Sequence, residues 1–233
     1  MTSSANPAGN ETPPKRLGLV HTSATLVPVF QELCRAKLPN VDVFHISDDS
    51  VIKDVIVRQC VTPLTTRRLI DHVVSAEQAG ADRILVTCSS IGRAVEMSES
   101  LVSVPVLRVD RPMADHAVAT ANRIGVIATL TTTLEPTSDL IQRRAQAIGK
   151  QVVVTAKVCE GAFDALMSGD AVAHDDAITQ TLDEMANSVD CVVLAQASMA
   201  RVVDAAGGRW SLPILTSPPL AIDHLATLFA EQS

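Results

Sequence analysis

The chain contains the same pattern twice, which limits the folds it can adopt. The segment ADRILVTCSSIGR over residues 81–93 aligns with VDCVVLAQASMAR over residues 189–201. At this offset of 108 residues, Cys88 in the first copy stands where the second copy has Gln196. The period is too long for a solenoid repeat and suits a duplicated α/β unit. Two similar lobes with a cleft between them are therefore expected.

The repeat extends on both sides of this segment. Downstream, SVPVLRVD from Ser103 matches SLPILTSP from Ser211, and upstream, GLVHTSAT from Gly18 matches GVIATLTT from Gly125 at an offset of 107 residues. The matches predict a tail, a discontinuous first lobe and a second lobe. These cover residues 1–15, residues 16–121 with 214–233, and residues 122–213, respectively.

Composition excludes several classes of protein. The net charge is −7 and aromatic residues make up only 2%, so the basic patch and stacking rings of a nucleic-acid binder are missing. No stretch approaches the roughly 18 uninterrupted apolar residues of a membrane span. The tail MTSSANPAGNETPPK has no apolar core, so it is expected to be a disordered segment rather than a signal peptide. A cytoplasmic location is expected by default.

Cysteine and histidine spacing gives no sign of a disulfide framework or a metal site. Five cysteines at irregular spacing fit a reducing compartment, and six scattered histidines form no HxH or HExxH pair. Neither GxGxxG nor GxxxxGK[ST] occurs, so a nucleotide site has no support. The sequence predicts that neither a metal nor another cofactor is needed.

Apolar runs alternate with helical patterns along the chain, which predicts two doubly wound parallel sheets covered by helices. The expected strands are residues 18–21, 41–46, 84–87, 104–109, 124–128, 152–156 and 191–194. The expected helices are residues 29–36, 62–79, 93–99, 113–122, 136–148 and 176–186.

In open parallel sheets, ligands bind beyond the carboxyl ends of the strands. The residues there are small and carry hydroxyl, thiol or amide groups, which suit a small carboxylate held by hydroxyl and backbone N–H donors at helix N-termini. The candidates for this contact are His21, Ser23, Ser89, Ser90, Thr129, Thr131, Thr132, Thr133, Ala197 and Ser198, beside Cys88 and Gln196.

Cys88 is the strongest candidate for chemistry. It follows a buried strand and precedes Ser-Ser-Ile-Gly, a turn into a helix where N–H groups and the helix dipole favour a thiolate. The alternative is a buried structural cysteine, the commonest role of this residue. His21, at the end of the first strand, either contacts a substrate or is a hydrogen-bonded loop histidine. The threonines near 131–133 either bind a carboxylate or cap the next helix.

With VTCSSIG, RIGVIATLTTTLEPT and VPVLRVDRPMA, the chain resembles the aspartate/glutamate/hydantoin racemase superfamily over nearly all of residues 16–229. The resemblance implies two pseudo-symmetric α/β lobes, no cofactor, a small carboxylate substrate and often a homo-oligomer, a dimer or larger. It also implies one catalytic cysteine from each lobe. Cys88 matches the first, but the second segment reads LAQASMA, with Gln196 in place of the second cysteine.

Glutamine does not exchange protons at useful pKa values, although its amide donates and accepts hydrogen bonds. Three readings remain open. In the first, the chain is an isomerase in which Cys88 alone moves a proton at the carbon next to a carboxylate or carbonyl. In the second, it is a decarboxylase in which Cys88 protonates a carbanion. In the third, it is a non-catalytic protein that binds a small acid.

Overall fold

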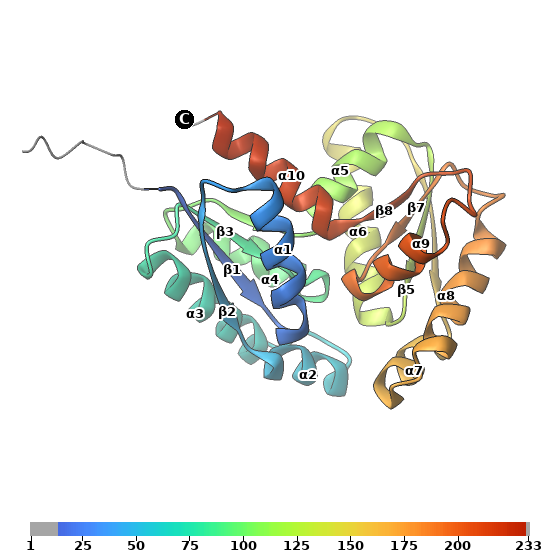
Figure 1. The fold of residues 1–233 in the computed structure, drawn as a ribbon, viewed down its shortest axis with the longest axis horizontal. Helices are drawn as coiled ribbons and strands as arrows, with labels where there is room; N and C mark the ends of the chain where they lie inside the picture. Colours follow the sequence, from blue (N-terminus) through green and yellow to red (C-terminus); the bar gives the residue numbers. More distant parts are fainter. Residues whose placement is uncertain (1–13, 232–233) are drawn as a thin grey trace, which may run out of the picture.

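The computed structural model describes residues 14–231, which form two α/β lobes (Figure 1). The first sheet contains β1 (Arg16–His21), β2 (Asp42–Ser47), β3 (Arg83–Val86) and β4 (Val106–Arg108) in the order β2-β1-β3-β4. The second contains β5 (Arg123–Ala128), β6 (Val153–Val158), β7 (Cys191–Leu194) and β8 (Ile214–Thr216) in the order β6-β5-β7-β8. All pairings are parallel, so the predicted fold class is confirmed.

The two sheets share one topology, which explains the repeat in the sequence. In each, the chain passes from the first strand to an edge strand and then crosses to the other side of the first strand. This places a topological switch point between β1 and β3 in one lobe and between β5 and β7 in the other. Ligands of open α/β sheets bind at such points.

Ten α-helices cover the sheets within residues 14–231. They are α1 (Val27–Lys37), α2 (Asp49–Arg58), α3 (Pro63–Gln78), α4 (Gly92–Ser98), α5 (Arg111–Thr120), α6 (Thr131–Ala147), α7 (Ala162–Ser168), α8 (Ala171–Met185), α9 (Ala200–Ala205) and α10 (Ser217–Ala230). Short 3-10 turns follow β1, β3 and β7 and another follows α4, at Ala24–Leu26, Ser89–Ile91, Ala197–Met199 and Glu99–Leu101. Within the described residues, no helix is long and apolar enough to cross a membrane.

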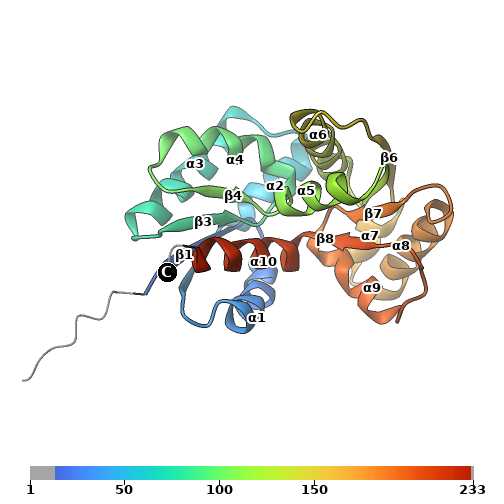
Figure 2. The ribbon, with the colours of Figure 1, turned by 90° about the horizontal axis from the view of Figure 1, so that it is seen from above.

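The helix that follows the last strand of each sheet packs on the other lobe. Met113 and Ala117 of α5 lie in the apolar core with β5 and β7, whereas Ile222 and Leu225 of α10 pack against β1 and β3. The two helices contact each other between the lobes (Figure 2). This exchange follows from covering both faces of each parallel sheet.

The exchange also changes the expected division of the chain. The predicted first lobe included 214–233, but Ile214–Thr216 pairs with β7 in the second sheet, and only the helix that follows it packs on the first lobe. The tail predicted over 1–15 lies outside the described residues except for Pro14 and Lys15.

Helix positions differ from the sequence prediction in both lobes. The helix α6 begins at Thr131 instead of Pro136, so Pro136 lies inside the helix. The helix α8 begins at Ala171 and α2, α7, α9 and α10 were not predicted. The α2 helix begins with an N-terminal cap, because the Asp48 side chain accepts a hydrogen bond from the Ser50 N–H.

Candidate active site

Cys88 lies directly beyond the carboxyl end of β3, in the extended conformation that precedes the Ser89–Ile91 turn. Its side chain is partly buried. The Thr22 hydroxyl and the backbone N–H groups of Ser90 and Ile91 are the donors that favour a thiolate at this sulfur. The expected turn into a helix is therefore present, although the Cys88 side chain forms no capping hydrogen bond.

The thiol is nevertheless less acidic than the sequence suggested. Burial raises the pKa of Cys88, and the buried Asp110 carboxylate acts in the same direction, while the hydrogen bonds from Thr22, Ile91 and Ser90 only partly oppose this. Desolvation disfavours the charged form more strongly than these donors stabilise it. The expectation of a thiolate is thus corrected, because Cys88 is a neutral thiol near pH 7.

Gln196 occupies the equivalent position beyond β7. Its backbone has φ −126° and ψ 137°, close to the φ −130° and ψ 115° of Cys88. The side-chain Oε1 accepts hydrogen bonds from the Thr129 N–H at 2.5 Å and from the Thr129 hydroxyl at 3.0 Å. Within residues 14–231, no group accepts a hydrogen bond from Nε2 of this amide. The amide is therefore fixed in orientation and keeps two N–H donors for another partner.

Thr22 is the residue of this site that sequence reasoning missed. It follows β1 as Thr129 follows β5, at the offset of 107 residues seen between the two copies. Both threonines are buried; Thr129 hydrogen-bonds to Gln196, and Thr22 favours the thiolate of Cys88. The offset alone would have selected Thr22 once Thr129 was a candidate.

The predicted threonine cluster divides into three different environments. Thr131 is exposed at the start of α6, and Thr133 is buried with its hydroxyl 2.7 Å from that of Ser90. That bond joins the two lobes. Thr132 has a buried hydroxyl that makes no hydrogen bond within the described chain. Buried polar atoms are normally hydrogen-bonded. The Thr132 hydroxyl is therefore the one in this cluster whose capacity to hydrogen-bond is left for a ligand.

His21 has a structural environment. Its ring is 1% exposed, with Nδ1 2.8 Å from the Thr87 hydroxyl and Nε2 2.9 Å from Nδ1 of His45, which in turn reaches Gln31. Burial, and then the neighbouring His45, lower the pKa of His21 to about 4. Both ring nitrogens are occupied, so nothing in the geometry directs them at a substrate.

The other candidates lie beside these residues without forming hydrogen bonds across the lobes. Ser89 is buried, Ser23 bonds to Thr25, and Ala197 and Ser198 are partly exposed in the turn after Gln196. No hydrogen bond joins Cys88 to Gln196 in the described chain. The predicted grouping around a cleft is supported at one point by the Ser90–Thr133 bond and otherwise stays a prediction.

An ion-pair network connects the end of β4 with helices α4 and α6. The buried Arg108 makes two hydrogen bonds to the buried Asp110, at 2.9 and 2.7 Å, and a third at 2.5 Å to Glu96. Glu96 also accepts a hydrogen bond at 2.8 Å from Arg143 of α6, in the other lobe. Gly92 makes room for this arrangement, since a Cβ there would lie 2.2 Å from the Arg108 guanidinium.

The arrangement can transfer protons at one position and hold oxygen atoms at the other. Within the described residues, no group of three His, Cys, Asp or Glu side chains has the geometry to hold a metal ion. The acid and base chemistry available at the two switch points comes from Cys88, with Gln196 and Thr132 as hydrogen-bonding groups.

Comparison with known proteins gives one consistent result. The Asp/Glu/Hydantoin racemase family matches residues 17–225. A glutamate racemase from Bacillus anthracis has a TM-score of 0.71 at 16% identity, covering 95% of this chain and 84% of its own. An allantoin racemase from Pseudomonas fluorescens gives 0.67 at 17%, covering 93% and 91%, and an aspartate racemase from Picrophilus torridus gives 0.70 at 13%, covering 91% and 94%. No curated protein sequence matches.

Proposed function

Because the chain belongs to the Asp/Glu/hydantoin racemase family, we propose that it is an isomerase in which Cys88 alone moves a proton at carbon. The carbon lies next to the carboxylate or carbonyl of a small acid. The observation that carries this proposal is the equivalence of the two switch points, where one lobe presents the Cys88 thiol and the other the Gln196 amide.

Cys88 removes the proton once substrate binding has made its thiolate accessible. The neutral thiol of the free protein first releases its proton to solvent water, and the three donors around the sulfur stabilise the resulting charge. The thiolate then takes the proton from the substrate carbon, which leaves a planar enolate. The same sulfur returns a proton to the carbon skeleton on its own side.

Gln196 and Thr132 bind the oxygen atoms on which charge develops. Thr129 fixes the orientation of the Gln196 amide through Oε1. Nε2 therefore donates hydrogen bonds with little further loss of conformational entropy. The unpaired buried hydroxyl of Thr132 supplies a further donor. Together they hydrogen-bond to a carboxylate or enolate oxygen while Cys88 transfers the proton at the substrate carbon.

A single acid and base has a stereochemical consequence. Inversion at carbon requires a proton donor on the face opposite the base, and an amide is not such a donor. The proposal therefore favours isomerisation by transfer of the proton to a neighbouring atom of the enolate over racemisation, with exchange at the original carbon as a side reaction.

Exchange with solvent deuterium tests this directly. Small 2-amino, 2-hydroxy and 2-keto acids are incubated with the protein in deuterated water and followed by NMR. We expect deuterium at the carbon next to the carboxylate or carbonyl for at least one acid, loss of labelling in Cys88→Ala, and only a weaker rate in Gln196→Ala. Cys60→Ala is the matched control, because that cysteine is exposed and far from the site in sequence. Full labelling by Cys88→Ala contradicts the proposal.

A decarboxylase is the second candidate, favoured by the raised pKa of Cys88. A neutral thiol is already the acid that a carbanion needs after carbon dioxide departs, and no second base is required. Substituted malonates therefore belong in the same panel. Release of carbon dioxide that depends on Cys88, without exchange on any other acid, would select this reaction. Binding of acids with neither reaction would instead indicate a non-catalytic protein.

A further inference from the structure

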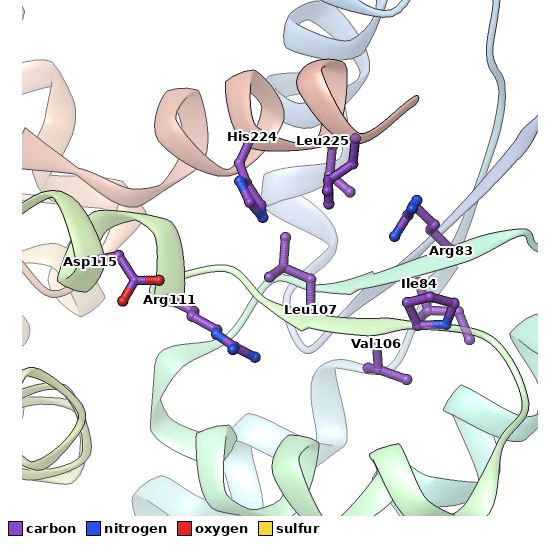
Figure 3. A pocket seen from close by; sticks show the side chains of 10 residues that line it. Arg83, Ile84, Val106, Leu107, Arg111, Asp115, His224 and Leu225 are labelled. Carbon is purple, nitrogen blue, oxygen red and sulfur yellow. The ribbon is translucent and has the colours of Figure 1, made fainter. Parts of the chain in front are cut away.

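A second pocket lies away from Cys88 and Gln196, between the lobe-crossing helices and the edge of the first sheet. Its volume is about 240 Å³. Its apolar floor comes from β3, β4 and α10, namely Ile84, Val106, Leu107, Leu225 and Leu228. Polar groups at its rim are Arg83, Arg111, Asp115 and His224 (Figure 3). None of these residues belongs to the candidate active site.

The two arginines of this pocket lack the partners that other arginines have. Arg83 has a buried Nε with no hydrogen bond, and its guanidinium lies over the Phe229 ring at 5.7 Å. Arg111, the first residue of α5, makes no ion pair within residues 14–231. The other arginines without an ion pair in that range, Arg35 and Arg67, are exposed on helices. The partly buried unpaired arginines thus meet in one pocket.

The remaining charge of the pocket is already neutralised. Asp115 forms an ion pair with Arg144 of α6, which leaves the charges of Arg83 and Arg111 uncompensated. A buried guanidinium nitrogen without an acceptor is costly, so an anionic ligand that supplies an acceptor would stabilise it. In a chain of net charge −7, two unpaired cations in one cavity are a local exception.

We propose that this pocket binds a small carboxylate with an aliphatic body. The carboxylate meets Arg111, whose planar group suits bidentate hydrogen bonds to a carboxylate. The aliphatic part covers Leu107 and Leu225, which lie between the arginines in Figure 3. A volume of about 240 Å³ limits the ligand to a few carbon atoms beyond the carboxylate.

Calorimetric titration of the full chain with hexanoate, acetate and inorganic phosphate tests the site. We expect hexanoate to bind at least tenfold more tightly than acetate or phosphate, because only hexanoate covers the apolar floor. Arg111→Gln should weaken hexanoate binding at least tenfold. Arg67→Gln, an exposed arginine on α3, and Cys88→Ser, in the other site, should leave it unchanged.

Three outcomes would overturn the proposal. They are equal affinity for phosphate and hexanoate, hexanoate binding that survives both Arg111→Gln and Arg83→Gln, and a change of oligomeric state in Arg111→Gln without any anion binding. The last would mean that the pocket is a contact between copies of the chain. Circular dichroism of Arg111→Gln guards against misfolding, and we expect it unchanged because the side chain has no ion pair to lose.

Discussion

Thr22 and Thr129 hold equivalent positions in the two lobes, and each acts on the side chain that follows the third strand of its own lobe. In the second lobe the Thr129 hydroxyl donates a hydrogen bond to Oε1 of Gln196 at 3.0 Å, and in the first the Thr22 hydroxyl favours the thiolate of Cys88. The duplicated fold has therefore kept its supporting threonine while the supported residue differs. A thiol and a fixed amide occupy equivalent positions in the two lobes.

Loss of the Thr22 hydroxyl should make Cys88 less reactive. Thr22→Val removes a donor that stabilises the thiolate, so the pKa of Cys88 should rise further above its ordinary value. The pH dependence of iodoacetamide labelling, read peptide by peptide in a mass spectrometer, measures this. We expect several-fold slower labelling of Cys88 at pH 8 and no change at the exposed Cys60. Thr129→Val is the control, because it contacts Gln196 instead, and an equal effect there would contradict the assignment.

A second thiol at the glutamine position should restore inversion. Gln196→Cys places a proton donor on the equivalent turn of the second lobe. For any acid that the parent chain labels with deuterium, the variant should convert one enantiomer into the other, which polarimetry or chiral chromatography detects. Gln196→Ser is the control of similar polarity and should not racemise. Racemisation by the parent chain at the same rate would show that the amide had never been limiting.

The repeat was sufficient to predict two parallel-sheet lobes because β1, β3, β5 and β7 are buried apolar runs, and the repeat aligns β1 with β5 and β3 with β7. The short helices α7 and α9 were not predicted from the sequence, for a physical reason. The α7 helix begins after Gly161, with no side-chain cap, and α9 is only six residues long, so neither offers the periodicity that identifies a helix. The crossing of α5 and α10 between lobes is a packing outcome that no local pattern contains.

The sequence predicted that Cys88, Gln196 and Thr129 follow strands, which the structure shows, whereas their role as a site stays a prediction. Electrostatics at these positions depends on three-dimensional neighbours, such as the buried Asp110 that helps to raise the pKa of Cys88. For the same reason, the sequence did not reveal that His21 uses both ring nitrogens within its own lobe.

Removal of the Arg108 charge should strongly destabilise the fold. Arg108→Met leaves Asp110, which is 0% exposed, without its partner, and breaking a buried pair from one side costs about 3 to 5 kcal/mol. Urea unfolding followed by circular dichroism measures the loss. Arg58→Gln is the matched control, since Arg58 and Asp54 form an exposed helical pair that contributes little to stability. Similar losses in both variants would contradict the burial argument.

A methyl group at position 92 should disturb the ion pair between Arg108 and Asp110. Its Cβ would lie 2.2 Å from the Arg108 guanidinium, so Gly92→Ala forces that side chain away from Asp110. Although alanine favours helices by about 1 kcal/mol over glycine, we expect net destabilisation. The combination Gly92→Ala with Arg108→Met should cost less than the sum of the two single changes, and strict additivity would count against this mechanism.

Acidification should destabilise the chain through His21. An unfolded histidine protonates near pH 6.5, whereas burial lowers the pKa of His21 to about 4 in the folded state. Between these values the unfolded chain binds more protons, so the free energy of unfolding falls as the pH drops from 6.5 to 4, by up to about 3 kcal/mol. The lowered pKa of His45 adds a change of the same sign. Urea unfolding at pH 7, 6, 5 and 4.5 should show this slope, and it should be smaller in His21→Gln than in the exposed control His116→Gln. An identical slope in both variants would assign the acid sensitivity to other groups.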